Sequence, residues 1–262
     1  MTPRLMAPSG KDTGDDVDRI ERECRELVAR ASEAGVQLRV VGGLAVRMHC
    51  ADNPYNQERE YGDVDLVTDS KLPDIDRAFQ GAGYEPFTRF NALHGHSRAI
   101  YYGEGDGLKV DVFIRSFSMC HELPVTERLD ADEPTVPLAE LLLTKLQIVR
   151  LNEKDVRDLC ALLIEHQVGF GDDETINADR FASICSCDWG LYHTVELNLG
   201  RLEEEAARLE MPSADRQVMR ERVNQLLERM ASHDKSRKWK MRARVGERVQ
   251  WYEEPDEVVD AH

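Results

Sequence analysis

The sequence lacks the features of several specialised protein classes. No apolar run approaches the roughly 18 residues that a membrane span requires, and no apolar stretch near the start precedes a small-residue cleavage site. We therefore expect a cytoplasmic protein with no membrane segment. Six cysteines among 262 residues are too sparse for a disulfide scaffold, so we expect reduced thiols. Cys185 and Cys187 could together hold a metal ion, but no partner at zinc-finger spacing accompanies them.

Positive charge is also scarce. The chain holds 34 Lys and Arg against 50 Asp and Glu, a net charge of -16, so its overall field should repel polyanions such as nucleic acids. Residues 234–248 are the exception, because they carry seven basic residues and two acidic ones around Trp239. This segment could contact nucleic acid or an acidic face of a partner protein, or it could be an ordinary solvated helix.

Strand patterns are confined to the first half of the chain. Apolar residues at helical spacing predict a helix over residues 15–35, and a β-branched run at 38–41 precedes a second helix. Further strands are predicted at 63–68, 86–90, 97–102 and 108–114, with a helix over 73–83 and a hairpin turn in the GEGDG stretch.

Strand signals cease after Pro137, where the character of the sequence changes. The predicted class is therefore α+β, with a sheet-containing part followed by a helical part. Helices are predicted at 137–151, 155–166, 176–185, 189–209 and 213–232. The predicted domains are a loose terminus at 1–13, a core at 14–130, a helical domain at 137–250 and an acidic tail at 251–262.

Two carboxylates stand two residues apart in the predicted strand Asp63-Val64-Asp65-Leu66. Side chains alternate between the faces of a strand, so both carboxylates project to one side. Each carboxylate disfavours ionisation of the other, and a bound divalent cation would remove that penalty. The pattern therefore indicates a metal site, although an Asp-x-Asp pair also occurs in caps and turns.

A third aspartate occupies a later predicted strand. There Val110, Val112 and Ile114 share one face, and Asp111 lies on the other. If this strand neighbours the Asp-x-Asp strand, the three carboxylates can converge. Oxygen ligands of this kind suit Mg²⁺ or Mn²⁺, which use a few carboxylates together with substrate phosphates.

Gly42 and Gly43 stand between a predicted strand and a predicted helix. The missing side chains permit close approach, and the first N–H groups of a helix can bind an anion. A Gly-Gly pair taken alone also serves as an ordinary turn. Its position before an Asp-x-Asp strand makes the combination more specific than either part.

Taken together, VVGGLAVRMHC, REYGDVDLV and KVDVFI resemble the motifs of the polymerase-beta-like nucleotidyltransferase superfamily. The diglycine, the arginine of REYGD and the stretch TKLQIVRLNEKDVRDL look like the AbiEii toxin-type group within it. The resemblance covers roughly residues 38–166. It implies a nucleotidyltransferase-like mixed sheet with flanking helices, followed by a C-terminal helical domain.

The resemblance also implies an activity, which is transfer of a nucleoside monophosphate from an NTP to a hydroxyl acceptor with release of pyrophosphate. Asp63, Asp65 and Asp111 would hold the metal ions, and Asp111 would lie near the acceptor hydroxyl. The acceptor is open between a small molecule and tRNA. The alternatives are a toxin component that acts on tRNA and is neutralised by a protein partner, and a non-catalytic module that binds nucleotide or a partner.

The remaining residues of the resemblance concern the nucleotide phosphates. Gly42 and Gly43 would cradle the β- and γ-phosphates, and Arg59 and Lys145 would neutralise them. Asp155 belongs to a Lys-Asp pair that the resembling group carries at this place. A helix N-cap is the competing role for Asp155.

The position of Lys145 is unusual in its own right. In the helix predicted over 137–151, Leu142 and Val149 mark an apolar stripe, with Glu140 and Gln147 on the opposite side. Lys145 falls inside the stripe, so it must either extend to the edge or meet an anion. The resemblance favours an anion in the cleft between the two domains.

Overall fold

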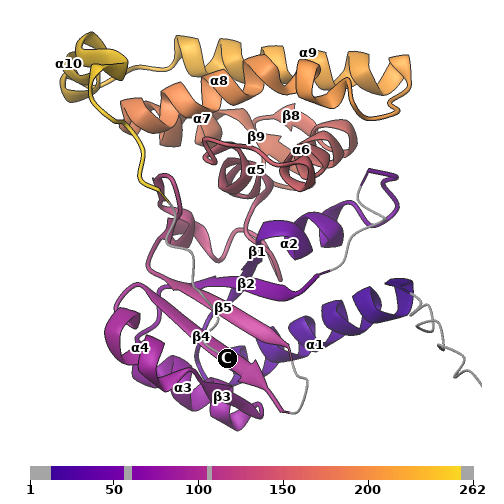
Figure 1. The fold of residues 1–262 in the computed structure, drawn as a ribbon, viewed down its shortest axis with the longest axis vertical. Coiled ribbons are helices and arrows are strands. Elements are labelled where there is room, and N and C mark those ends of the chain that lie inside the picture. Colours follow the sequence, from indigo (N-terminus) through magenta and orange to yellow (C-terminus); the bar gives the residue numbers. More distant parts are fainter. Residues whose placement is uncertain (1–12, 56–60, 105–107, 255–262) are drawn as a thin grey trace, which may run out of the picture.

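The fold is a mixed sheet drawn below a layer of helices in Figure 1. The computed structural model describes residues 13–55, 61–104 and 108–254. The sheet has the order β1-β2-β5-β4-β3, in which β2 and β5 are parallel and the other neighbours antiparallel. Its strands are Arg39–Val41 (β1), Asp63–Thr68 (β2), Tyr84–Pro86 (β3), Arg98–Gly103 (β4) and Lys109–Ile114 (β5). The predicted α+β class with a mixed sheet is confirmed.

The two central strands form because their alternating aliphatic residues fill a core. Val64 and Leu66 of β2 are fully buried, and Leu66 lies opposite the buried Val112 of β5. Helix α1 (Thr13–Glu33) lies to the right of the strands in Figure 1, and α3 (Leu72–Gly81) contacts both α1 and β3. The hairpin turn predicted between β4 and β5 falls mainly on residues 105–107, which lie outside the described residues, as do residues 1–12 of the predicted loose terminus.

The prediction of a strand over 86–90 is wrong. Strand β3 ends at Pro86, and Thr88–His94 forms helix α4. The buried Asn91 side chain donates to the backbone oxygen of Ile100 and accepts from its N–H, at 3.1 and 2.8 Å. These two bonds hold α4 against β4, a contact that no local pattern in the sequence specifies.

Helix α5 (Leu138–Leu146) is the centre of the helical layer, and all nine of its residues are buried. Glu140 and Gln147, which the sequence places opposite the apolar stripe, are therefore not on a solvent-facing side, because both are fully buried. Glu140 is 2.7 Å from Arg180, and Gln147 accepts from the backbone N–H of His121 at 2.9 Å. The other helices of this layer are α6 (Glu153–Glu165), α7 (Ala178–Cys187), α8 (Trp189–Ala206), α9 (Ser213–Ser232) and α10 (Arg237–Val245).

Short strands also occur after Pro137, contrary to the sequence prediction. Gln167–Gly169 (β8) pairs in parallel with Thr175–Asn177 (β9). Each has three residues, which is too short to show an alternating pattern. Two more short strands, Phe117–Ser118 (β6) and Glu122–Leu123 (β7), pair between the sheet and the helical layer.

The sheet and the helical layer share one hydrophobic core. Helix α2 (Gly42–His49) contacts β1 and β2 on one side and α5 and α6 on the other. The connecting residues 134–136 also pair with the edge strand β1, where Val40 donates to the Pro134 oxygen at 2.8 Å. Within the described ranges, no helix combines the length and apolar character needed to cross a membrane.

Candidate active site

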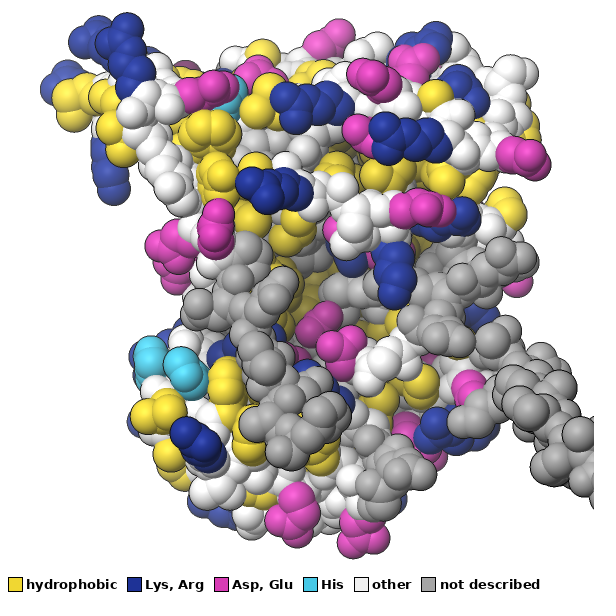
Figure 2. Space-filling model, in the orientation of Figure 1, with side chains coloured by type: hydrophobic (Ala, Val, Ile, Leu, Met, Phe, Trp, Pro, Cys, Tyr) yellow, Lys and Arg dark blue, Asp and Glu magenta, His cyan; other side chains and the backbone are white. Residues whose placement is uncertain are grey.

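Strands β2 and β5 bring the three predicted carboxylates together. In their parallel register Asp65 lies directly opposite Asp111, and Asp63 lies opposite Lys109. Paired residues on neighbouring strands point to the same face of a sheet, so Asp65 and Asp111 are adjacent and Asp63 lies one step along. Figure 2 shows acidic side chains in the hollow between the sheet and the helical layer.

Burial differs strongly among these three carboxylates. Asp63 is exposed, Asp65 is half-buried, and Asp111 is only 2% exposed. Burial raises the pKa of Asp65 to about 7, and the charges of Asp63 and Asp111 add to the increase. An ionised Asp65 is therefore disfavoured until a positive charge approaches it.

The backbone at Gly42 lies close to the side chain of Asp65. The Gly42 φ of +69° lies in the left-handed region, and a Cβ at this position would stand 2.5 Å from Oδ2 of Asp65. Glycine is thus required both by the backbone conformation and by the approach of the carboxylate. Gly42 and Gly43 begin helix α2, and no side chain caps that end of the helix.

Arg98 of β4 is a residue that the sequence analysis missed. Its Nε and Nη2 donate to the two carboxylate oxygens of Asp111 at 2.8 and 2.5 Å. Such a bidentate pair is a strong charge-assisted contact. The arginine balances part of the negative charge of the three carboxylates.

Lys145 does not extend to the solvent, because it is only 8% exposed. Its Nζ lies 2.8 Å from Asp158 and 3.3 Å from Asp155, both on α6. Its charge also lowers the pKa of Asp65. The anions that Lys145 contacts in this structure are therefore the protein's own carboxylates. The sequence analysis did not predict the contact with Asp158.

Asp155 has two partners in the structure. The N-cap of α6 is Asn152, and Asp155 stands three residues later in a capping box, accepting from the Asn152 N–H at 3.4 Å. Its other carboxylate oxygen contacts Lys145. The N-cap role proposed for Asp155 therefore belongs to Asn152, three residues earlier, and the alternative role, a pair with Lys145, is present. Arg59, the other predicted phosphate-binding residue, lies outside the described residues.

The donor set at the sheet fits a hard divalent cation. It consists of carboxylate oxygens from two adjacent strands. Gly42 lies beside them, and its missing side chain leaves room for the Asp65 carboxylate. Mg²⁺ and Mn²⁺ take ligands of this type. The pKa of Asp65 is raised, so its ionised form is disfavoured in the metal-free protein, and a bound cation would stabilise that form.

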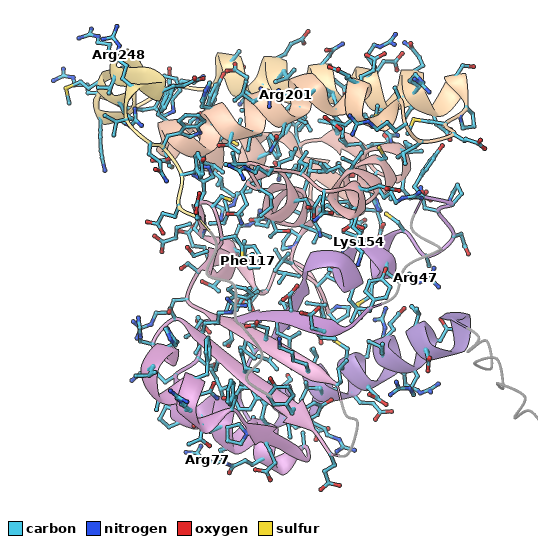
Figure 3. The ribbon with its side chains drawn as sticks, viewed as in Figure 1. Arg47, Arg77, Phe117, Lys154, Arg201 and Arg248 are labelled. Carbon is cyan, nitrogen blue, oxygen red and sulfur yellow. The ribbon has the colours of Figure 1, made fainter. Side chains whose placement is uncertain are left out.

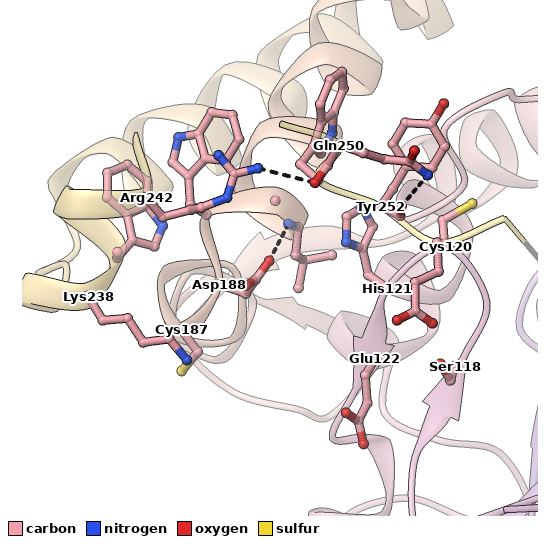
Figure 4. Close-up of a pocket in the computed structure, with 16 residues that line it drawn as sticks. Ser118, Cys120, His121, Glu122, Cys187, Asp188, Lys238, Arg242, Gln250 and Tyr252 are labelled. Atoms are coloured by element: carbon pink, nitrogen blue, oxygen red, sulfur yellow. Dashed lines mark hydrogen bonds between the residues drawn. The ribbon is translucent and has the colours of Figure 1, made fainter. Parts of the chain in front are cut away.

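A second cavity, of about 530 Å³, lies between the start of α8, α10 and residues 250–253 (Figure 4). Arg242 stacks over Trp189 at 4.5 Å and donates to the backbone oxygens of Gly246 and Val249. The Arg242 guanidinium therefore interacts with groups of the protein itself. This cavity shares no residue with the carboxylate group.

The basic segment of residues 234–248 divides into packed and exposed parts. Trp239 packs edge-on against Tyr192 at 5.2 Å, whereas Lys238 and Lys240 are exposed. Arg248, at the far end, points away from the rest of the molecule in Figure 3. The exposed residues agree with a solvated basic surface, and nucleic-acid contact stays a prediction.

Comparisons with known proteins give only a distant likeness. No protein-family model and no curated protein matches the chain. The solved structure of JHP933 from Helicobacter pylori is 12% identical, with a TM-score of 0.40, covering 90% of this chain and 97% of that chain. An H. pylori structure named "putative nucleotidyltransferase" is 12% identical, with a TM-score of 0.37, covering 88% and 98%. Likeness at this level identifies neither a family nor an activity.

Proposed function

We propose that the protein is a metal-dependent nucleotidyltransferase, which moves a nucleoside monophosphate from an NTP to a hydroxyl acceptor. One observation supports this above all others: Asp65 and Asp111 are register partners on parallel strands, and Asp65 lies so close to the Gly42 bend that a Cβ there would clash with its carboxylate. Placement in the AbiEii toxin-type group is a finer proposal that rests on the sequence motifs alone.

Asp63, Asp65 and Asp111 are the proposed holders of Mg²⁺ or Mn²⁺. When bound, the ions would supply positive charge where charge develops on the attacking and leaving oxygens. Each Asp111 oxygen accepts one hydrogen bond from Arg98 and keeps a further lone-pair site. Asp111 can therefore both contribute to the metal site and accept a proton.

The transfer is a balanced displacement at phosphorus. The acceptor oxygen bonds to the α-phosphorus while the bond to the pyrophosphate oxygen breaks, and the acceptor proton passes to Asp111. The N–H groups of Gly42 and Gly43 would bind the departing phosphates at the uncapped start of α2. Lys145, held by Asp155 and Asp158, would add positive charge on the side of α5.

The direct test measures transfer of label from each of the four α-labelled NTPs with Mg²⁺ or Mn²⁺. The wild type is compared with Asp63→Ala/Asp65→Ala and with Asp69→Ala, which removes an exposed aspartate just beyond β2. We expect transfer by the wild type and by Asp69→Ala. The double variant should lose about 10³-fold or more, because metal stabilisation of the transition state is worth several kcal/mol.

Equal transfer by the wild type and the double variant would remove the proposed site. Binding of NTP without transfer to any acceptor would instead favour the non-catalytic module. Reactions with bulk tRNA and with small hydroxylated compounds such as aminoglycosides identify the acceptor class. Salt-sensitive transfer to tRNA that is lost on exchanging Lys238 and Lys240 for alanine would favour the tRNA-directed toxin.

A further inference from the structure

A second group of metal-binding side chains lies away from the carboxylate cleft. His49 is the last residue of α2, His166 directly follows α6, and Glu174 stands in the loop before β9. One ligand atom from each of the three lies within 4.8 Å of the others. The group thus joins the helix that starts at the diglycine bend to the helical layer.

The two imidazoles are held in place by their surroundings. Their rings meet edge-on with centroids 5.7 Å apart, and His166 is only 4% exposed. His49 Nε2 lies 2.7 Å from Thr135 Oγ1, and His166 Nδ1 lies 3.5 Å from the Glu174 carboxylate.

Glu174 shows a second, independent feature. Its φ of +46° lies in the left-handed region, which is uncommon and unfavourable for a residue other than glycine or asparagine. Its exposed carboxylate nevertheless approaches the buried His166. Unfavourable backbone conformations of this kind are concentrated at ligand sites.

Further donors and negative charge surround the two histidines. Asp132 Oδ2 lies 3.7 Å from His49 Nε2, and Cys50 Sγ lies 3.7 Å from His166 Nε2. The two histidines therefore lie among oxygen and sulfur atoms that can bind a metal ion.

We propose that His49, His166 and Glu174 bind one Zn²⁺ ion, with Asp132 or water as the fourth ligand. Two imidazoles and a carboxylate are a typical zinc donor set. Ligand atoms around tetrahedral zinc lie roughly 3.3 Å apart, so each pair of ligand atoms, now within 4.8 Å, would close by at most about 1.5 Å. The ion would fasten the end of α2 to α6 and the β8–β9 loop. None of its ligands belongs to the proposed transferase site.

The test measures zinc binding in the Asp63→Ala/Asp65→Ala background, so that the carboxylate cleft does not contribute. We expect about one Zn²⁺ per chain by elemental analysis after dialysis, and a Kd from competition with a chromogenic chelator. Adding Glu174→Gln should weaken binding at least tenfold, and adding His166→Ala should weaken it more. His96→Ala, which removes an exposed histidine, is the matched control and should leave the Kd unchanged.

Thermal unfolding supplies a second readout. Zn²⁺ should raise the midpoint of the double variant, and the increase should be much smaller after Glu174→Gln, because only binding to the folded state stabilises it. Absence of bound zinc would overturn the proposal. Equal affinity of the Glu174→Gln and His96→Ala proteins would also overturn it. If His166→Ala does not fold, the comparison of Glu174→Gln with His96→Ala still tests the proposal, because Glu174 is exposed. The binding and unfolding measurements do not depend on nucleotide transfer.

Discussion

In the described part of the protein, two groups of acids differ in how far nearby cations balance their charge. In the helical layer Glu140 is close to Arg128 and Arg180, and Lys145 lies between Asp155 and Asp158. At the sheet, Arg98 pairs with Asp111, which lies beside Asp63 and Asp65, and the pKa of Asp65 is nevertheless raised. Acids matched by cations stabilise the architecture, whereas acids held in excess are positioned for a ligand.

The largest expected effect is on the matched set. Lys145→Met leaves Asp155 and Asp158 buried without their lysine, and removing one partner of a buried pair costs about 3–5 kcal/mol. Urea unfolding should show this loss in the free energy of unfolding. Lys154→Met, an exposed lysine on the same helix as the two acids, should change it by less than about 0.5 kcal/mol. Similar small changes in both variants would show that the two sets do not differ.

The excess set should respond in the opposite direction. The folded-state pKa of Asp65, about 7, lies above the ordinary value of 3.8, so stability falls as pH rises from about 4 to 7 and the full penalty is present above pH 7. Asp65→Asn should therefore stabilise the metal-free protein at pH 8 by roughly 2–4 kcal/mol, and much less at pH 4. Urea unfolding in EDTA at the two pH values measures this. A variant no more stable than the wild type at pH 8 would contradict the excess of charge.

Arg98 sets how much of that excess is left for a metal. Arg98→Gln removes a competing positive charge from Asp111, so we expect Mn²⁺ to bind about tenfold more tightly. Isothermal titration with Mn²⁺ measures the Kd, and the exposed Arg89→Gln is the matched control. Weaker binding after Arg98→Gln would mean that the arginine instead orders Asp111 for the ion.

The smallest effect on stability is expected at the diglycine bend. Gly42→Ala forces a side chain into a left-handed conformation, at about 1 kcal/mol, and places a Cβ against the Asp65 carboxylate. The carboxylate can rotate away from the new Cβ, so the loss of stability should stay small. The rotation displaces a proposed metal ligand, so transfer activity should fall strongly. Gly81→Ala, at an open position in α3, should change neither quantity appreciably. Undiminished transfer by Gly42→Ala would separate the bend from the reaction.

Local patterns predicted β2, β5 and the shared face of Asp63 and Asp65, because strand alternation is a property of consecutive residues. They failed at residues 88–94, where the two hydrogen bonds between Asn91 and β4 favour a helix. They also did not reveal that Glu140, placed opposite the apolar stripe, is fully buried. Its burial depends on Arg180, which is forty residues away in the chain.

The sequence by itself determined the α+β class, the alternation that groups Asp63 with Asp65, and the anomaly of a lysine within an apolar stripe. Only the tertiary structure decided that Asp111 is the register partner of Asp65 and that Arg98 binds Asp111. It alone brought His49, His166 and Glu174 together. The physical reason is that periodicity fixes which face a side chain takes, whereas strand order and packing fix which other side chains it meets.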